Sequence, residues 1–294
     1  MSFDEVKNLR LQQLENRLNE ITCQKPKYHQ TVVDSMRYSL LNGGKRIRAM
    51  LVMGFYESMG GDYHDVLDAA AAIEMIHAYS LKHDDLPCMD NDDYRRGKFT
   101  NHKVYGEAMA MLAGDGLLTY AFEVLSSCVN KFPAEYIVKA INCLAEGAGF
   151  NGMIGGQVID IENEGKKINE DMLYDLHSRK TGCLIKTACK LGVILGGGDE
   201  ESFKNAEEYG KNIGMAFQIQ DDILDVEGNP ELLGKSIGND AENNKTTFVT
   251  IYGIEKSKEM TKEYFKNAYN ALEKINGSKE FLVGITNFLT SREW

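Results

Sequence analysis

Apolar residues recur at helical spacing along almost the whole 294-residue chain, and this periodicity is its strongest constraint on the fold. Near the start, Leu11, Leu14, Leu18 and Ile21 follow one another at intervals of three or four residues, which is typical of an amphipathic helix. Strand-like alternation is scarce, and the four prolines lie outside the strongly periodic segments. The pattern therefore predicts an all-α chain folded as a single large helical domain over 1–294.

Glycine and proline stops place the ends of the expected helices. These helices span about 4–22, 30–41, 45–60, 63–84, 103–130, 133–148, 150–163, 169–179, 182–195, 199–226, 246–251, 254–275 and 279–290. The 63–84 segment is rich in alanine and isoleucine, so we expect it to be buried on most sides. No internal repeat or low-complexity linker stands out.

Composition excludes several classes of protein. Apolar residues make up 43% of the chain, enough for a sizeable core, and the net charge of −11 argues against a general basic surface for nucleic acid. The six cysteines include no C-x-x-C pair, which indicates reduced thiols in a cytoplasmic protein. The N-terminal residues lack an apolar signal core, and no run reaches the ~18 apolar residues needed to cross a bilayer.

The segment from His77 to Lys98 carries a dense cluster of charge. Five aspartates fall between Asp84 and Asp93, and Arg95 and Arg96 follow at once. Like charges this close repel one another, so a cation among them would stabilise the cluster. Carboxylate oxygens suit Mg2+, whereas the guanidinium groups match phosphate oxygens. The cluster points to diphosphate chemistry, and a solvated acidic loop is the alternative.

A second carboxylate cluster ends the expected 199–226 helix. Asp221 and Asp225 are four residues apart and share a helical face, with Asp222 beside them. A charged helix end that points into water is the alternative. Since Asp84 and Asp85 also close an apolar helix, we expect the two helices to face each other and hold metal ions between them.

Basic residues recur at loops and helix junctions. The Gly43-to-Arg48 run places cations and amide donors at an expected helix start, which is a natural anion site, although it is not a Walker A loop. A flexible loop with surface cations is the alternative there, and single lysines in such loops are more often solvated than functional. His77 lies two helical turns before Asp84 on the same face, although a buried histidine is usually satisfied by the core.

Taken together, these motifs resemble those of the trans-isoprenyl diphosphate synthases, the polyprenyl synthetase family, and the match runs in order from about residue 40 to 252. The motifs that carry the resemblance are Asp84-Asp85 with Asp90, Asp221-Asp222 with Asp225, Gly43-Gly44-Lys45 with Arg48, Arg95-Arg96-Gly97, Lys180-Thr181-Gly182, Gly234-Lys235 and Asn243-Asn244-Lys245-Thr246. The resemblance implies a helical bundle around a central cavity and a head-to-tail prenyl transfer.

The resemblance also implies roles for individual residues. Mg2+ ions, three per active site and with Mn2+ as an alternative, would be held by Asp84, Asp85, Asp90, Asp221, Asp222 and Asp225. The allylic diphosphate would be bound by Arg95, Lys180, Lys235 and Lys245, with Thr181 and Gln218 steadying the allylic cation. Isopentenyl diphosphate would be held without metal by Gly44, Lys45, Arg48, His77 and Arg96. The released diphosphate itself would remove the last proton, so no side-chain base is expected.

Product length is expected to depend on the depth of an apolar pocket. Tyr79 stands five residues before Asp84, roughly 7.5 Å along a helix axis, where a ring would floor the pocket. Together with Ser80, this position resembles that of bacterial farnesyl diphosphate synthases and implies a C15 product. Tyr79 as an ordinary core residue, with another residue setting the depth, is the alternative.

Three other functions remain open at this point. A geranylgeranyl diphosphate synthase, with a C20 product, shares every motif. A terpene cyclase would not need the Lys45 and Arg48 site, and a non-catalytic partner subunit of a two-chain prenyltransferase would lack some of the aspartates that are present here. The resemblance implies a homodimer, with the 103–130 helix at the dimer face.

Overall fold

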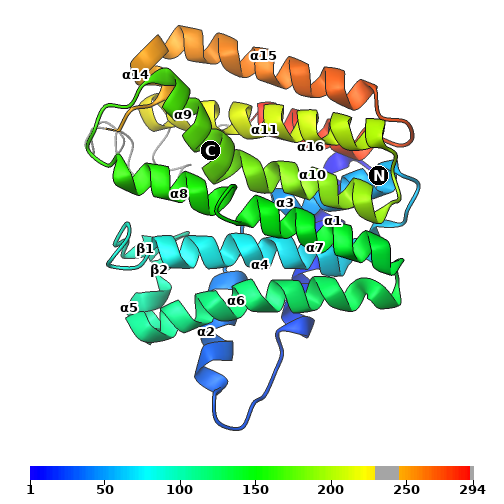
Figure 1. Ribbon diagram of the computed structural model, residues 1–294, viewed down its shortest axis with the longest axis vertical. Helices are drawn as coiled ribbons and strands as arrows, with labels where there is room; N and C mark the ends of the chain where they lie inside the picture. The colour runs from blue at the N-terminus through cyan, green and yellow to red at the C-terminus, as the bar shows by residue number, and fades with distance from the viewer. Residues whose placement is uncertain (229–244, 292–294) are drawn as a thin grey trace. The chain divides into compact units, whose positions relative to one another are not determined.

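The computed structural model describes residues 1–228 and 245–291 and confirms the all-α fold class (Figure 1). The chain divides into two compact units, one formed by residues 1–53 and 62–141 and the other by residues 54–61 and 142 onward. That the units form a single domain stays a prediction.

The first unit is built on α4. Its elements are α1 (Phe3–Ile21), α2 (Gln30–Leu40), the start of α3 (Ile47–Ser58), a 3-10 turn (Tyr63–Val66), α4 (Leu67–Asp84), β1 (Tyr94–Arg95), β2 (Lys98–Phe99), α5 (Asn101–Tyr105), α6 (Glu107–Ser127), a 3-10 turn (Cys128–Asn130) and the start of α7 (Ala134–Ala148). Twelve of the 18 residues of α4 are buried, as the sequence predicts, because α6, α2 and α1 pack around it (Figure 1).

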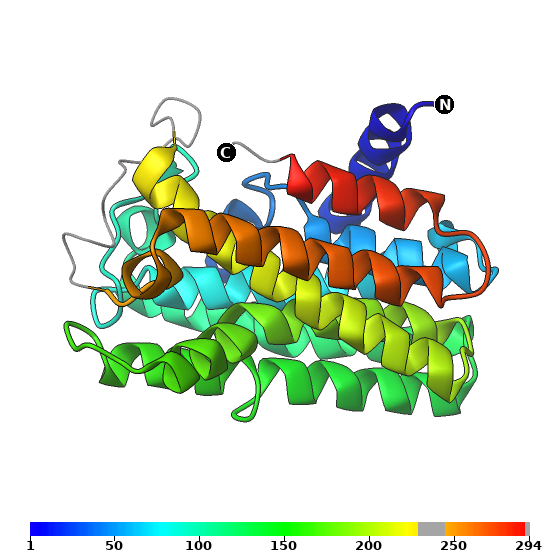
Figure 2. The same ribbon diagram turned by 90° about the horizontal axis from the view of Figure 1, so that it is seen from above.

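The second unit is built on α11. Its further elements are α8 (Met153–Glu162), α9 (Glu170–His177), a π-helical segment (Ser178–Gly182), α10 (Cys183–Leu195), α11 (Glu200–Glu227), α14 (Phe248–Tyr252), α15 (Ile254–Glu273) and α16 (Glu280–Thr290). Both α15 and α10 pack along α11 (Figure 2). In its core the rings of Phe55 and Tyr209 meet edge to face at 5.2 Å, and the Tyr209 hydroxyl lies 2.9 Å from Thr286 Oγ1.

The two units repeat one local arrangement. In each, a long helix has aspartates at its C-terminal end, and further along the chain a five-residue helix, one glycine and a second long helix follow one another; this second long helix packs along the first. The glycines have nearly the same backbone angles, with φ 83° and ψ 159° at Gly106 and φ 77° and ψ 163° at Gly253. The sequence shows no matching repeat, because backbone conformation is shared where side chains are not.

The structure differs from the sequence-based expectation in two details that matter for the site. The expected 103–130 helix is interrupted at Gly106, because a residue at φ 83° cannot continue a right-handed helix. A short antiparallel hairpin stands where only a loop was expected, with Tyr94 opposite Phe99 and Arg95 opposite Lys98. This hairpin carries the arginine pair that follows the first acidic cluster.

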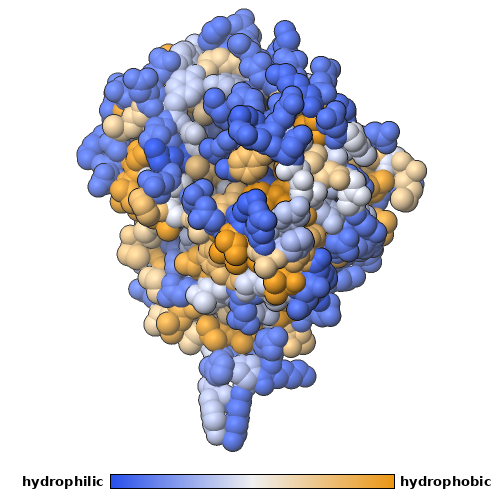
Figure 3. Space-filling model, turned by 45° about the vertical axis from the view of Figure 1, so that its right-hand side comes forward, coloured by the Kyte–Doolittle hydropathy of each residue, from blue (hydrophilic) through white to orange (hydrophobic). Residues whose placement is uncertain are grey.

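One described helical stretch, Glu107–Asn130, is long and apolar enough by length and composition alone to cross a membrane, and 39% of its apolar window is buried. No uninterrupted apolar run of this length was expected from the sequence. The stretch nevertheless qualifies, because a hydropathy average tolerates the glycine, serine and threonine residues between the apolar ones. The core helix of a soluble protein passes the same test. Hydrophobic residues also appear among hydrophilic ones on the face drawn in Figure 3, as they do on ordinary protein surfaces.

We expect Gly106→Ala and Gly253→Ala each to lower the free energy of unfolding by about 1–3 kcal/mol, because their backbone angles lie in a region that is essentially restricted to glycine. Urea denaturation followed by circular dichroism measures this loss. Ala108→Ser, at an exposed position next to Gly106, is the control and should change stability by less than about 0.5 kcal/mol. Equal losses in all three variants would contradict the prediction.

Candidate active site

The first acidic motif folds back on itself at the end of α4. The Asp90 amide donates to the Asp84 carbonyl at 2.8 Å, and the Met89 and Asn91 amides both donate to the Leu86 carbonyl, at 2.8 and 3.1 Å. Since the five intervening residues make a turn, Asp90 lies next to Asp84. The spacing of the motif thus brings its first and last aspartates together at one helix end.

Asp85 is paired with Arg95. This carboxylate is only 3% exposed, and its Oδ1 accepts from Arg95 Nε at 2.7 Å and Nη2 at 2.6 Å. Burial raises the pKa of Asp85, and the arginine opposes that rise. The residue expected to bind metal and the residue expected to bind diphosphate therefore neutralise each other, and their predicted roles require this pair to be shared or opened.

The glycine-rich turn before α3 has an unusual backbone. Gly43, Gly44 and Arg46 all have positive φ, at 70°, 125° and 50°. The Arg96 guanidinium donates from Nη1 to the Gly43 carbonyl, and a Cβ on Gly44 would lie 2.7 Å from Arg96 Nη1. The close approach of Arg96 therefore requires glycine at position 44, and it joins two motifs that lie about 50 residues apart in the sequence.

A solvent-open hollow of about 460 Å³ lies beside this turn. Its lining includes Arg46, His77, Asp85, Arg95 and Arg96. Burial and the surrounding arginines hold the pKa of His77 well below its ordinary value, so its imidazole is neutral and can donate a hydrogen bond without carrying charge. The structure thus brings the predicted His77 and Arg96 together at one cavity.

Lys45, on the turn, and Arg48, in the first turn of α3, are predicted for the same site but are not among the residues that line the hollow. Arg48 Nε is buried and has no hydrogen-bond partner within the described part of the chain. Such an unpaired donor is costly to bury, so the site has capacity left for an anionic ligand.

Lys82 also lines the hollow, and sequence reasoning did not select it. Its side chain is 2% exposed, and Nζ donates to the Ser35 carbonyl at 3.0 Å. Asn101 bonds to the same carbonyl at 2.8 Å, so three helices meet at one acceptor. Burial lowers the pKa of Lys82 to about 7. Lys82 follows Ala78, which also lines the hollow, by four residues, so the two lie on the same face of α4. This helical spacing is the signal in the sequence that could have identified Lys82.

Tyr79 is buried in the first unit. It is 5% exposed, its ring meets His83 edge to face at 5.7 Å, and its hydroxyl has no partner among the described residues. Burial, with a smaller effect of Asp84, raises the pKa of Tyr79 to about 12. His83 Nε2 lies 3.1 Å from the Met111 carbonyl of α6, so Tyr79 lies on the face of α4 that is turned to α6. Ser80 donates to the His77 carbonyl at 3.0 Å, within the helix.

The predicted Lys180 and Thr181 lie in the π-helical segment between α9 and α10. Lys180 Nζ lies 2.5 Å from Asp160 Oδ2, a carboxylate of α8 that the sequence analysis did not identify. A Cβ on Gly156 would lie 2.2 Å from the Lys180 amide, so glycine at position 156 allows close packing of α8 against the π-helical segment. Asp160 follows Gly156 by one helical turn, and this spacing could have revealed it.

A chain of hydrogen bonds links Thr181 to the second acidic motif. Thr181 Oγ1 donates to Gln218 Oε1 at 3.1 Å, and Gln218 Nε2 donates to Asp222 Oδ1 at 3.2 Å. The other oxygen of Asp222 accepts from the Phe248 amide at 2.8 Å. Asp222 is 3% exposed, and each of its two oxygens accepts a hydrogen bond from a protein donor.

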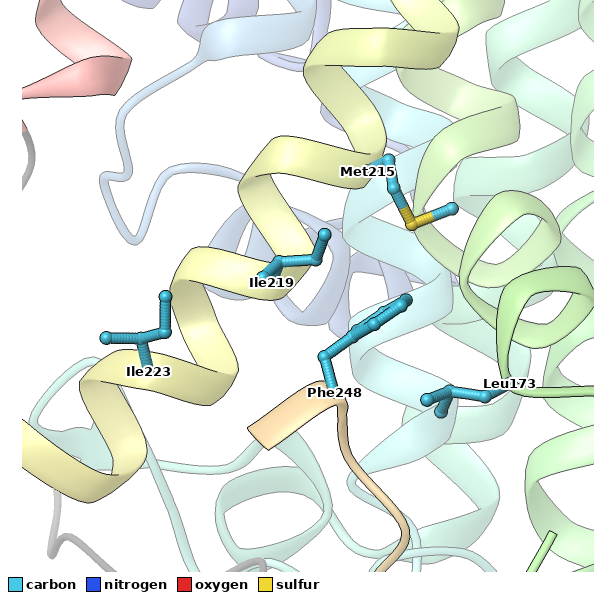
Figure 4. Close-up of a cluster of buried hydrophobic side chains, with 5 residues drawn as sticks. All are labelled: Leu173, Met215, Ile219, Ile223 and Phe248. Carbon is cyan, nitrogen blue, oxygen red and sulfur yellow. The ribbon is translucent and has the colours of Figure 1, made fainter. Parts of the chain in front are cut away.

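A buried apolar cluster holds this carboxylate in place. Phe248 points between Ile219 and Leu173, with Met215 and Ile223 completing the group (Figure 4). Ile219 and Ile223 flank Asp222 along α11, and the fully buried Phe248 ring fixes the start of α14 against them. Packing therefore sets the position of the amide that binds Asp222.

The remaining predicted residues are distributed around the end of α11. Asp221 is half-buried and Asp225 is 4% exposed. Lys245 is exposed, and Lys235 lies outside the described residues, as do Gly234, Asn243 and Asn244. Within residues 1–228 and 245–291, no three histidine, cysteine, aspartate or glutamate side chains are grouped closely enough to hold a metal ion. The paired Asp84 and Asp90 turn, with oxygen donors alone, nevertheless fits a hard cation that completes its sphere with water and phosphate oxygens.

Comparison with known proteins places these features in a family. The sequence model of the polyprenyl synthetase family matches residues 29–285. A farnesyl diphosphate synthase of Micrococcus luteus is 43% identical over 270 residues, covering 90% of this chain and 92% of the relative. A geranylgeranyl diphosphate synthase of Cyanophora paradoxa is also 43% identical, over 262 residues, covering 89% of this chain and 87% of the relative.

The fold agrees with these relatives. The crystal structure of an FPP/GFPP synthase from Zymomonas mobilis superposes with a TM-score of 0.88 at 31% identity, covering 98% of this chain and 99% of that one. The chain belongs to the polyprenyl synthetase family of trans-isoprenyl diphosphate synthases, and it is a prenyltransferase of the isoprenoid synthase fold. Enzymes of this family generally depend on a divalent metal.

Asp222→Asn is expected to lower the free energy of unfolding by about 1–3 kcal/mol even in metal-free buffer, because the new amide group would face an existing N–H donor. Urea denaturation in the presence of a chelator measures this change. The neighbouring half-buried Asp221→Asn is the control and should be less destabilised. An unchanged Asp222→Asn protein would show that the two bonds do not stabilise the fold.

Acid is expected to destabilise the fold partly through His177. Burial lowers its pKa to about 4 from an ordinary value of 6.5, so between these values the unfolded chain binds a proton that the folded chain does not. Stability should therefore fall as the pH drops from 6.5 to 4. Urea midpoints across this range should fall less steeply in His177→Gln than in the unmodified protein, and parallel profiles would contradict this assignment.

Proposed function

We propose that this protein is a farnesyl diphosphate synthase, which condenses isopentenyl diphosphate head to tail with dimethylallyl and then geranyl diphosphate to give the C15 product. The observation that carries the proposal is the complete set of charged groups for two diphosphates, distributed over an acidic turn and a basic pocket. Family membership and the names of the relatives support the reaction class.

The allylic diphosphate is assigned to the acidic motifs. Asp84, Asp85, Asp90, Asp221, Asp222 and Asp225 are the proposed ligands of the Mg2+ ions, which supply positive charge to the leaving diphosphate when bound. Both oxygens of Asp222 already accept protein hydrogen bonds, so Asp222 also holds the motif in place.

Basic and polar side chains complete the allylic site. Arg95, Lys180, Lys235 and Lys245 would bind the diphosphate. Asp85 and Asp160 hold Arg95 and Lys180 at fixed positions, and these two pairs would have to be shared or opened when the diphosphate binds. The hydrogen-bonded Thr181 and Gln218 present oxygen dipoles that would stabilise the allylic cation.

Isopentenyl diphosphate is assigned to the basic hollow of the first unit. Arg96 and the neutral His77 line it, Gly44 and Lys45 lie in the adjoining turn, and Arg48 follows in the first turn of α3. No metal is needed here, because guanidinium and ammonium groups suffice to bind the diphosphate. Arg48 would then satisfy its buried Nε donor on the ligand.

The length of the product, C15 or C20, is the most specific feature of the proposed function. Relatives that make C15 and C20 products are equally similar at 43% identity, so a geranylgeranyl diphosphate synthase is the second candidate. The buried Tyr79 ring supports the shorter product, since it occupies space on the α6 side of α4 one to two turns before Asp84. Ser80, the next residue, is predicted to contribute to product length together with Tyr79.

We further propose a cytoplasmic homodimer. Met111 and Leu112 of α6 are 41% and 56% exposed, so this helix presents apolar surface that a second copy could cover. Sedimentation of the purified protein as a monomer would contradict the dimer.

Purified protein supplied with Mg2+, isopentenyl diphosphate and dimethylallyl diphosphate should release mainly C15 product. Tyr79→Ala should shift the product to C20 or longer, because loss of the ring would deepen the apolar pocket expected for the growing prenyl chain. Chromatography by chain length measures the shift. Tyr136→Ala, a half-exposed tyrosine of α7, is the control. A C20 product from the unmodified protein would favour the second candidate, and an unchanged Tyr79→Ala profile would refute the role of Tyr79.

A further inference from the structure

Glu74 is a buried carboxylate in the middle of α4 to which the proposed reaction assigns no role. It is 2% exposed, although an unpaired carboxylate is strongly disfavoured in a protein interior. Its Oε1 accepts from the Ala49 amide at 3.1 Å, and its Oε2 accepts from Arg46 Nη1 at 3.3 Å. Both donors come from the segment that carries Lys45 and Arg48.

Arg46 is the residue through which Glu74 reaches this turn. Its backbone has φ 50°, a conformation that residues other than glycine rarely adopt. Its guanidinium is used entirely within the protein, since Nη2 donates to the Leu40 carbonyl at 2.5 Å and Nε donates to Glu15 at 2.8 Å. Arg46 is thus a structural cation that anchors the left-handed turn.

Glu74 also balances the charge of the cations beside it. Burial lowers the pKa of Arg48 and of Arg96, and the Glu74 carboxylate opposes both shifts. Of the other described acids nearby, Asp85 is engaged by Arg95, and Glu15 lies nearer the surface with a side chain that is 31% exposed. Glu74 is therefore the buried counter-charge that Arg46, Arg48 and Arg96 share.

We propose that Glu74 is a positioning residue for the isopentenyl diphosphate site: by binding Arg46 and the Ala49 amide, it fixes the turn that presents Lys45 and Arg48 to the ligand. This inference rests on the proposed function of that site. Glu74 itself does not touch the substrate, because both of its oxygens face the turn. Its effect therefore belongs to binding of one substrate and not to the chemical step.

Glu74→Gln tests the proposal because it keeps the shape of the side chain but removes its charge. The KM for isopentenyl diphosphate should rise by about ten- to hundredfold, as expected for losing one hydrogen bond between charged groups, with kcat and the KM for the allylic substrate nearly unchanged. Calorimetric titration with isopentenyl diphosphate in metal-free buffer should show the same weakening. Glu74→Asp should recover part of the affinity.

Asp68→Asn is the matched control. Asp68 is another buried carboxylate of α4, 6% exposed, and it is paired with Arg17 at 2.6 Å and Lys131 at 3.6 Å, outside the pocket lining. Its loss should lower stability without changing either KM. Arg46→Lys provides a second test should Glu74→Gln fail to fold, and it should raise the same KM.

The outcomes separate the two proposals. If the unmodified protein condenses neither starter with isopentenyl diphosphate, the proposed function fails. If it does condense them but Glu74→Gln and Arg46→Lys bind isopentenyl diphosphate as well as Asp68→Asn does, the function stands and the positioning role of Glu74 is refuted.

Discussion

The pairing of buried and half-buried charges organises both units of this protein. A charge removed from water is strongly unfavourable unless an opposite charge or several hydrogen bonds replace the water. Asp85 meets Arg95, Arg46 meets Glu74, and Lys180 meets Asp160, each within 3.3 Å. These pairs include residues that the proposed reaction needs for metal and phosphate. The charged site is thus held in place by its own internal pairing, and the proposed binding would exchange one set of partners for another.

Backbone conformation supports this arrangement at a few positions. The left-handed Arg46 and Arg96 each belong to a turn that carries cations, and Gly44 leaves room for the Arg96 guanidinium. Gly106 and Gly253 each end a five-residue helix and begin a long one. In both units this allows a long helix to begin directly after a short one and to pack along the helix that ends in aspartates.

Much of the fold and part of the site could be predicted from the sequence. The periodicity placed the helices, because burial of one face imposes spacing that is visible in the residues. The predicted Thr181 and Gln218 do meet, as do His77 and Arg96 at one hollow. Glu74 and Asp160 were missed, because a single carboxylate within a helix gives no sign of its partner. The hairpin that carries Arg95 was missed as well, since two-residue strands leave no periodic signal.

The sequence by itself determined the all-α class, the order of the charged motifs and the family to which they point, because helical periodicity and motif spacing are local properties. Only the tertiary structure decided which charges are free and which are paired. It showed Asp222 with both oxygens engaged, Arg46 consumed by Glu15 and Glu74, and Lys82 buried at the pocket wall. Such pairing depends on residues that are far apart in the chain and become neighbours only through packing, and no local pattern specifies it.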